Sequence, residues 1–207
     1  MSVVTEPAGG PIEAIEARPE DGGAIASVLR DAFLNDPLMS YIYPNPVTRP
    51  DRLRSFYSIL HRGARRYGAV YTTTGIEAAT LWRAPGHAKM SMIEMLREGR
   101  QWIRATRSAL PRALSVSAAV DANHPATPHW YLQIAGCVPR HQRKGYGGSV
   151  IRAGIARATS EGMPCYLETA IPDNVPYYER LGFSVTREWT IRNGMKFWGM
   201  WRPCDEA

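Results

Sequence analysis

Cysteine is scarce in this sequence and shows no functional spacing. The 207 residues include three cysteines, Cys137, Cys165 and Cys204, with no CxxC pair and no His/Cys spacing typical of a metal site. An odd, scattered set argues against a disulfide framework and against structural zinc. We therefore expect no metal and a reducing compartment.

Long apolar runs and targeting signals are also lacking. No stretch reaches the roughly 18 consecutive apolar residues that a membrane-spanning helix needs. The first residues, MSVVTEPAGGPIEA, have no basic stretch followed by an apolar core. These absences favour a soluble, cytoplasmic protein without a membrane partner.

The composition supports one globular core. A hydrophobic content of 44% in 207 residues is enough for one sizeable core. We expect a single domain over residues 1–207, with a flexible N-terminal tail at residues 1–10. The formal net charge of +6 favours acidic partners such as nucleic acid, anionic lipid or a small polyanionic ligand.

Hydrophobic periodicity predicts alternating strands and helices. Helices are predicted from Pro19 to Asn35 and over about 49–66, 89–120, 145–162 and 174–180. Strands are predicted at 12–18, 69–75, 77–84, 129–138, 165–171, 183–191 and 195–201, with hairpins at Gly75 and at Asn193-Gly194. This order implies an α/β or α+β architecture around one mixed sheet.

The segment 89–120 is rich in arginine. Spacings of three and four place Arg97, Arg100, Arg104 and Arg107 on one helical face, while Met92, Met95, Leu96, Trp102 and Ile103 lie mostly on other faces. We interpret the stripe as a solvated helix face, and a docking surface for an acidic partner is the alternative.

The stretch RHQRKGYGG (140–148) lies between a predicted strand and a predicted helix. The free N–H groups and the dipole at a helix start attract phosphate, and glycines let a bulky anion approach the backbone. A P-loop is excluded because Lys144 precedes its glycine and no Ser or Thr stands in the place that the P-loop pattern requires. A dinucleotide fingerprint is a near miss, since 145–150 ends in Val150. The remaining pattern is QxxGxG, at Gln142 to Gly147.

This pattern resembles the pyrophosphate-binding loop of the GNAT acetyltransferase superfamily. Three further stretches match that family in order and spacing, namely WYLQIAGCVP (130–139), YLETA (166–170) and NVPYYERLGF (174–183). The resemblance implies an acetyl-CoA-binding core at 129–191 and the GNAT fold, a single mixed, mostly antiparallel sheet of about seven strands flanked by helices. Ala32-Phe33-x-x-Asp36-Pro37 and Leu81-Trp82-x-x-Pro85 look like the subgroup that contains puromycin N-acetyltransferase.

The resemblance also implies acetyl-CoA as cosubstrate, without a metal. The backbone N–H groups of the opened fourth strand, at Gly136, Cys137 and Val138, would stabilise the oxyanion. Tyr178 matches the general acid that protonates the leaving thiolate, because spacing from Asn174 and Gly182 selects it over Tyr177. The implied cofactor contacts are Gly136, Cys137, Val138, Gln142, Arg143, Lys144, Gly145, Tyr146, Gly147, Gly148, Ser149, Asn174 and Tyr178.

Cys137 is a candidate nucleophile by residue type. No His/Asp arrangement is placed to activate it, so we interpret it as a small buried hydrophobe.

The acceptor implied by the family is a primary amine of a small molecule, such as an antibiotic or aminonucleoside. Glu168 is the candidate general base, with Asp36, Glu179, His124 or His129 as alternatives. Phe33, Asp36 and Glu168 are the candidate substrate contacts.

Other functions remain open at this stage. A protein or peptide amine is the alternative acceptor, and a CoA-binding sensor without catalysis is a further reading. A nucleic-acid-binding module using RHQRK fits less well, because those basic residues precede a helix start and the phosphates of CoA account for them. Trp198 and Trp201 predict an apolar edge for a homodimer.

Overall fold

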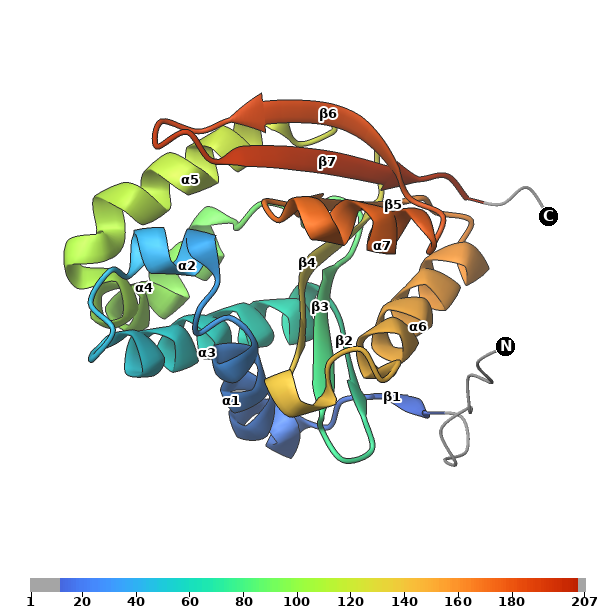
Figure 1. Cartoon of the computed structure of the whole chain (residues 1–207), viewed down its shortest axis with the longest axis horizontal. Helices are drawn as coiled ribbons and strands as arrows, with labels where there is room; N and C mark the ends of the chain where they lie inside the picture. The colour runs from blue at the N-terminus through green and yellow to red at the C-terminus, as the bar shows by residue number, and fades with distance from the viewer. Residues whose placement is uncertain (1–11, 205–207) are drawn as a thin grey trace, which may run out of the picture.

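A seven-stranded sheet forms the centre of the computed structural model, which describes residues 12–204 (Figure 1). The tail predicted at 1–10 lies outside the described residues. The strands are β1 (Ala14–Glu16), β2 (Gly68–Thr73), β3 (Ala78–Arg83), β4 (Trp130–Cys137), β5 (Cys165–Thr169), β6 (Ser184–Thr190) and β7 (Lys196–Arg202). Their order is β1-β2-β3-β4-β5-β7-β6, and only the β4–β5 pair is parallel. The predicted mixed, mostly antiparallel sheet is confirmed.

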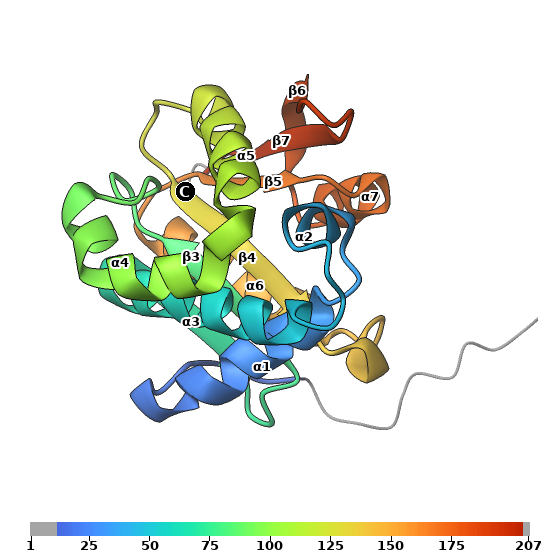
Figure 2. The same ribbon diagram turned by 90° about the vertical axis from the view of Figure 1, so that its left-hand side faces the viewer.

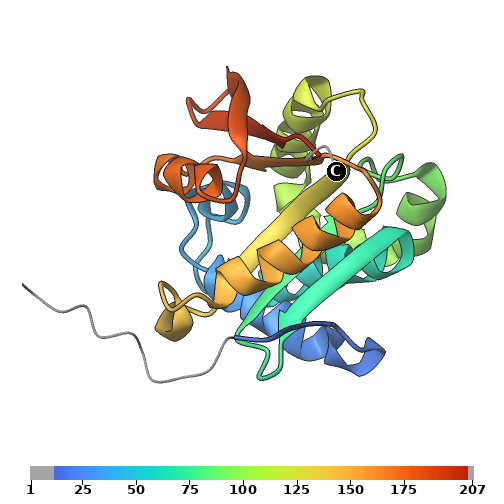
Figure 3. The ribbon, with the colours of Figure 1, turned by 90° about the vertical axis from the view of Figure 1, so that its right-hand side faces the viewer.

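Helices cover both faces of this sheet. They are α1 (Gly22–Ala32), α2 (Pro37–Ile42), α3 (Arg49–Tyr67), α4 (Met92–Thr106), α5 (Leu110–Asn123), α6 (Tyr146–Ser160) and α7 (Val175–Glu179), with short 3-10 turns at Pro19–Asp21, Arg107–Ala109, Pro139–His141 and Pro172–Asn174. Helices α1 and α3 pack on one face and α6 crosses the other (Figure 3). Strand β2 serves both cores, since Val70 faces α1 and α3 whereas Ala69 faces α6.

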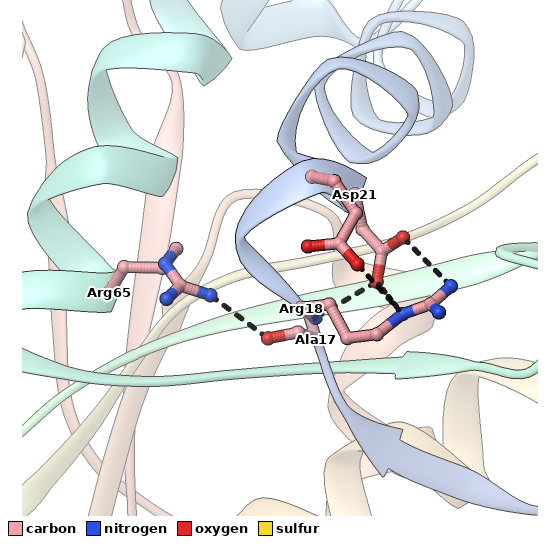
Figure 4. Close-up of polar contacts among 5 residues, drawn as sticks. Ala17, Arg18, Asp21 and Arg65 are labelled. Carbon is pink, nitrogen blue, oxygen red and sulfur yellow. Dashed lines mark hydrogen bonds and ion pairs between the residues drawn. The ribbon is translucent and has the colours of Figure 1, made fainter.

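The first strand is tied to the helical layer. Arg65 of α3 donates a hydrogen bond to the carbonyl of Ala17 at 3.0 Å (Figure 4). Asp21 accepts from the backbone N–H of Arg18 at 2.9 Å, and this bond holds the pKa of the Asp21 carboxyl below its usual range. These contacts hold the chain between β1 and α1 against α3.

The arginine-rich segment forms two helices and not one. Helix α4 ends at Thr106, and Arg107 adopts a positive φ of 39° before α5 begins (Figure 2). Its arginines are exposed as predicted, but Leu96 and Ile103 are exposed too, at 77% and 67%. The solvated face is therefore wider than the arginine stripe and includes these two aliphatic side chains.

Buried charge explains the orientation of α4. Arg83 of β3 is 2% exposed and makes a two-pronged pair with Glu94, at 2.9 and 2.7 Å. One turn further on, Glu98 pairs with Arg62 of α3 at 2.6 Å. A buried guanidinium without a partner is very costly. Glu94 and Glu98 of α4 therefore face inward, while Ile93, Leu96 and Ile103 are exposed.

Helix α2, with six residues, is too short to give a recognisable hydrophobic period in the sequence. Asp36 begins it by accepting a hydrogen bond from the backbone N–H of Met39 at 2.9 Å, and Pro37 occupies the first helical position. Asp36 therefore has a structural role at the point where substrate contact was predicted.

The last hairpin differs from the prediction in one respect. Strand β7 lies between β5 and β6, so Trp198 and Trp201 do not form an edge of the sheet. The ring of Trp201 packs 5.5 Å from His129 and 6.4 Å from Tyr166. The basis for the predicted homodimer edge is thereby removed. Within residues 12–204, no helix has the length and hydropathy of a membrane span.

Helix α6 approaches the sheet closely at one glycine. A Cβ on Gly154 would overlap the indole of Trp82, whereas a Cβ on Gly99 of α4 would meet nothing within 4 Å. We expect Gly154→Ala to lower the free energy of unfolding by about 1 to 3 kcal/mol. The matched control Gly99→Ala should raise it by about 0.5 to 1 kcal/mol. Urea unfolding of both variants checks this, and equal effects would contradict the close approach.

Candidate functional site

A cleft of about 560 Å³ opens between β4, α6 and α7. It joins the end of β4, the glycine loop, the first turns of α6 and the tyrosine pair of α7. Its lining residues are Ala135, Gly136, Cys137, Gln142, Arg143, Gly145, Gly147, Gly148, Ile151, Arg152, Asn174, Tyr177, Tyr178 and Arg180. Nine of the predicted cofactor contacts are therefore brought together.

Four predicted contacts lie elsewhere. Ser149 lines a neighbouring hollow, and Lys144 is exposed on the loop. The ring of Tyr146 packs 5.1 Å from that of His141. Val138 is buried, at 6% exposed.

The glycine loop is shaped by its backbone. Gly145 precedes α6 with a φ of 93°, a conformation that side-chain-bearing residues rarely adopt. The first N–H groups of α6 have no intrahelical acceptor, and Gly147 and Gly148 place two of these residues on the cleft wall. The loop therefore offers an anion site at a helix N-terminus.

Space and charge at this loop fit a phosphate. A Cβ on Gly147 would meet only Tyr177 Oη, at 3.6 Å, so packing alone does not demand glycine there. The guanidinium of Arg152 lies 3.2 Å from the position of a Gly148 Cβ, so its charge is held beside the loop. Sequence reasoning missed Arg152, although its i+4 spacing from Gly148 places both on one face of α6.

Strands β4 and β5 separate soon after they meet. Their parallel pairing covers Trp130 with Cys165 and Tyr131 with Tyr166, and no later pair is formed. Beyond this point the edge of β4 that faces β5 has no strand partner among the described residues. The gap between the strands gives the cleft access to β4 backbone groups.

The free donors on that edge differ from the predicted three. The N–H of Val138 donates to the carbonyl of Glu77 on the β3 side, at 3.0 Å. Alternate residues of a strand direct their N–H groups to opposite edges, so Gly136 also faces β3 and Cys137 faces the gap. The carbonyl of Cys137 accepts from Gln142 Nε2 at 3.1 Å, which agrees with this orientation. The N–H groups of Cys137 and Ala135 therefore face the gap, and those of Val138 and Gly136 face β3.

Gly136 has a packing role instead. A Cβ there would lie 2.8 Å from Leu29 Cδ2 and 3.2 Å from Phe33 Cε2. Glycine thus lets α1 approach β4 and places Phe33 beside the strand. The ring of Phe33 also lies 5.4 Å from that of Tyr57.

Both tyrosines of α7 line the cleft. Spacing selected Tyr178 as the residue facing it, but the ring of Tyr177 lies 5.4 Å away and lines the same wall. Tyr177 Oη points toward Gly147, whereas Tyr178 is buried and packs 6.1 Å from Phe183. Burial raises the pKa of both phenols, so both hold their protons at neutral pH.

Asn174 does not cap α7 through its side chain. Its Nδ2 donates to Thr169 Oγ1 at 3.3 Å, which links the start of α7 to β5. The amide remains on the cleft wall.

Glu168 faces the opposite side of the sheet from the cleft. Its neighbour Leu167 packs with α6, and period-two alternation sends Glu168 to the other face. There Glu168 Oε1 lies 3.1 Å from His124 Nδ1, and each side chain is 5% exposed. Among the other candidate bases, Asp36 caps α2 and Glu179 is exposed.

The two candidate histidines form a buried pair. His124 Nε2 lies 3.0 Å from His129 Nε2, and His129 Nδ1 lies 2.6 Å from the carbonyl of Thr127. Burial lowers the pKa of His129. Sequence reasoning treated each histidine separately, because their spacing of five residues does not reveal that both lie in one chain of contacts with Glu168.

Cys137 should be unreactive. Burial, with the charge of Glu77, raises the pKa of its thiol to about 11, which leaves about one thiol in a thousand ionised at pH 8. We expect iodoacetamide to label Cys137 about a hundredfold more slowly in the folded protein than in urea. Peptide mass spectrometry measures this, and equal labelling rates would contradict the raised pKa of this partly buried thiol.

Comparison with known proteins agrees with this geometry. Residues 115–183 match the model of the acetyltransferase (GNAT) family. An uncharacterized N-acetyltransferase of Schizosaccharomyces pombe is 28% identical over 176 residues, which cover 76% of this chain and 68% of that protein.

Solved structures share the fold over nearly the whole chain. A histone acetyltransferase HPA2 and related acetyltransferase from Corynebacterium glutamicum has a TM-score of 0.69 and 22% identity, covering 95% of this chain and 98% of its own. An arylalkylamine N-acetyltransferase 2 from Aedes aegypti has a TM-score of 0.59 and 14% identity, covering 94% and 99%. A GNAT family acetyltransferase from Brucella melitensis in complex with acetyl-CoA has a TM-score of 0.50 and 17% identity, covering 92% and 88%.

These likenesses establish the GNAT fold. The match to the acetyltransferase (GNAT) family covers residues 115–183, about a third of the chain. The likeness to the puromycin N-acetyltransferase subgroup stays a prediction.

Proposed function

We propose that the protein is an N-acetyltransferase that moves an acetyl group from acetyl-CoA to a primary amine of a small molecule. The observation that carries this proposal is the single cleft in which the start of α6, the open edge of β4 and Tyr178 meet. An anion site, a donor for a developing oxyanion and a proton donor are the three groups that direct acyl transfer needs.

The cleft fits the cosubstrate. The start of α6 and the guanidinium groups of Arg143, Arg152 and Arg180 would hold the phosphates. Gly147 leaves the loop open for a bulky anion. Acetyl-CoA supplies an activated thioester, and the structural relative from Brucella melitensis was crystallised with it.

Residues of the cleft account for the acyl-transfer step. The N–H of Cys137 would donate to the carbonyl oxygen as that oxygen gains charge. Tyr178 would give its proton to the departing sulfur, since its buried phenol is protonated at neutral pH.

Glu168 would act as the general base for the acceptor amine. It lies on β5 beyond the point where β4 and β5 separate, and its carboxylate would take the proton that the attacking ammonium must lose. Phe33, beside β4 on the same face as α1, would contact the acceptor.

The covering of the acceptor face favours a small molecule. Ala109 and Val116 of the α4–α5 region are buried in the core cluster on this face, and Trp102 packs against it. An extended peptide needs an open groove, whereas α4 and α5 lie over part of this face of the sheet (Figure 2). An antibiotic or aminonucleoside amine is thus favoured over a protein amine.

A thiol-release assay tests the proposed reaction. Acetyl-CoA is supplied with aminonucleosides, aminoglycosides, polyamines or peptides, and free CoA is measured. We expect release that depends on a small amine. Transfer to peptides alone would replace the proposed acceptor, and an absence of release with every class would contradict the proposed activity.

Tyr178→Phe should lower kcat by roughly a hundredfold or more, with the dissociation constant of acetyl-CoA little changed, because the variant lacks only the acidic proton. The control is Tyr177→Phe, which removes the neighbouring hydroxyl on the same wall and should retain most of the turnover. Steady-state kinetics and calorimetry measure the two quantities. Full activity of Tyr178→Phe would remove this residue from the mechanism.

Gly147→Glu should abolish the thermal stabilisation of the protein by CoA, because the new carboxylate fills and charges the phosphate site. Gly23→Glu is the matched control, since a Cβ at Gly23 meets nothing within 4 Å and Gly23 is not among the residues that line the cleft. Thermal melts with and without CoA give the comparison. Persistent stabilisation in Gly147→Glu would place the cosubstrate elsewhere.

A further inference from the structure

Three side chains and one carbonyl form a continuous buried chain of contacts behind the point where β4 and β5 separate. Glu168 Oε1 contacts His124 Nδ1 at 3.1 Å, His124 Nε2 contacts His129 Nε2 at 3.0 Å, and His129 Nδ1 contacts the Thr127 carbonyl at 2.6 Å. The chain joins β5 to the loop that precedes β4. It belongs to neither the cleft nor the phosphate loop.

The surrounding rings seal this chain from solvent. The ring of His124 lies edge-on to the rings of Tyr131 and Tyr166, with centroid distances of 4.8 and 4.9 Å. These two tyrosines are the last residues that pair β4 with β5. Trp201 of β7 packs against His129 at 5.5 Å. His124 therefore lies where β4 and β5 begin to separate. On β5, Glu168 follows two residues after Tyr166.

Few other charges act on this chain. The titratable neighbours are Tyr131 of β4 and Tyr166 of β5, whose pKa values are raised by burial and then by the charge of Glu168. Asp121 of α5 and Arg187 of β6 act on these two phenols at longer range. Both phenols are protonated at neutral pH, so the mobile protons reside on the carboxyl and the two imidazoles.

This chain has one hydrogen-bond contact more than it has protons when Glu168 is ionised and both histidines are neutral. Three contacts need three protons, and because the Thr127 carbonyl only accepts, His129 must be protonated at Nδ1. A carboxylate and two neutral imidazoles bring only two protons. In that state either the two Nε2 atoms, or His124 Nδ1 and Glu168, face each other with lone pairs. One added proton satisfies every contact.

We propose that Glu168, His124 and His129 form a proton relay, in which the two histidines are positioning residues that share the proton which Glu168 takes from the acceptor. The inference rests on the proposed function and names groups that serve the same reaction. Glu168 takes one proton from the ammonium, and the added proton is shared along Glu168, His124 and His129, so that each of the three contacts then holds one proton. His129 keeps its Nδ1 proton on the Thr127 carbonyl throughout, and the added proton leaves through Glu168 to solvent after the acetylated product departs.

Nitrogen-15 NMR of histidine tests the proton count without substrate, so it stands independently of the proposed function. In the whole wild-type protein we expect His129 to be protonated at Nδ1 and the three groups to gain one proton as a unit. In Glu168→Gln we expect His124 to be neutral at the same pH. Two rings that titrate independently, and identically in Glu168→Gln, would overturn the proposal.

Kinetics of His129→Gln test the relay itself. The glutamine amide can donate to or accept from His124 Nε2, so it restores the hydrogen bond but takes up no proton. We expect kcat to fall about a hundredfold, while acetyl-CoA affinity and melting temperature are retained. The acid limb of the kcat/KM profile should move to lower pH, because the contacts of the variant no longer require the third proton.

His129→Phe is the comparison, because it keeps a ring but removes the hydrogen bond. A structural role predicts that His129→Gln is active and His129→Phe is not, and this result would overturn the relay. If wild type shows no acetyl transfer while NMR shows the shared proton, the proposed function fails and the proton count stands.

Discussion

The early separation of β4 and β5 is the constraint on which the site depends. Two residue pairs join these parallel strands, and the remaining length of β4 has an edge that β5 does not cover. An unpaired strand edge is costly unless its N–H and C=O groups find other partners. Here Gln142 satisfies one carbonyl, at Cys137, and the free N–H groups remain available to the cleft.

The same separation arranges chemistry on two sides of the sheet. On the α6 side lie the glycine loop and Tyr178, and on the other side lie Glu168 and the histidines. Burial acts on both sets. It keeps Tyr178 protonated in the cleft, and it leaves the proton balance of the Glu168 chain to be decided by hydrogen bonds and not by water.

Buried charge pairs show how tertiary contacts override local pattern. Helix α4 reads as an amphipathic helix with an arginine face, yet Glu94 and Glu98 face inward because Arg83 and Arg62 require partners. Periodicity treats acids as solvent-facing. Periodicity carries no information that Arg83 of β3 is buried, so it did not predict the inward-facing acids.

The sequence by itself determined the order of the seven strands and the glycine-rich turn that joins β4 to α6, because these follow from local spacing and backbone sterics. It indicated most of the cleft wall through the family motifs. Only the tertiary structure decided which β4 amides are free, since Val138 and Cys137 differ by the strand edge each one faces. It alone brought His124, His129 and Glu168 together, because a contact across 44 residues depends on how β5 packs beside the loop before β4.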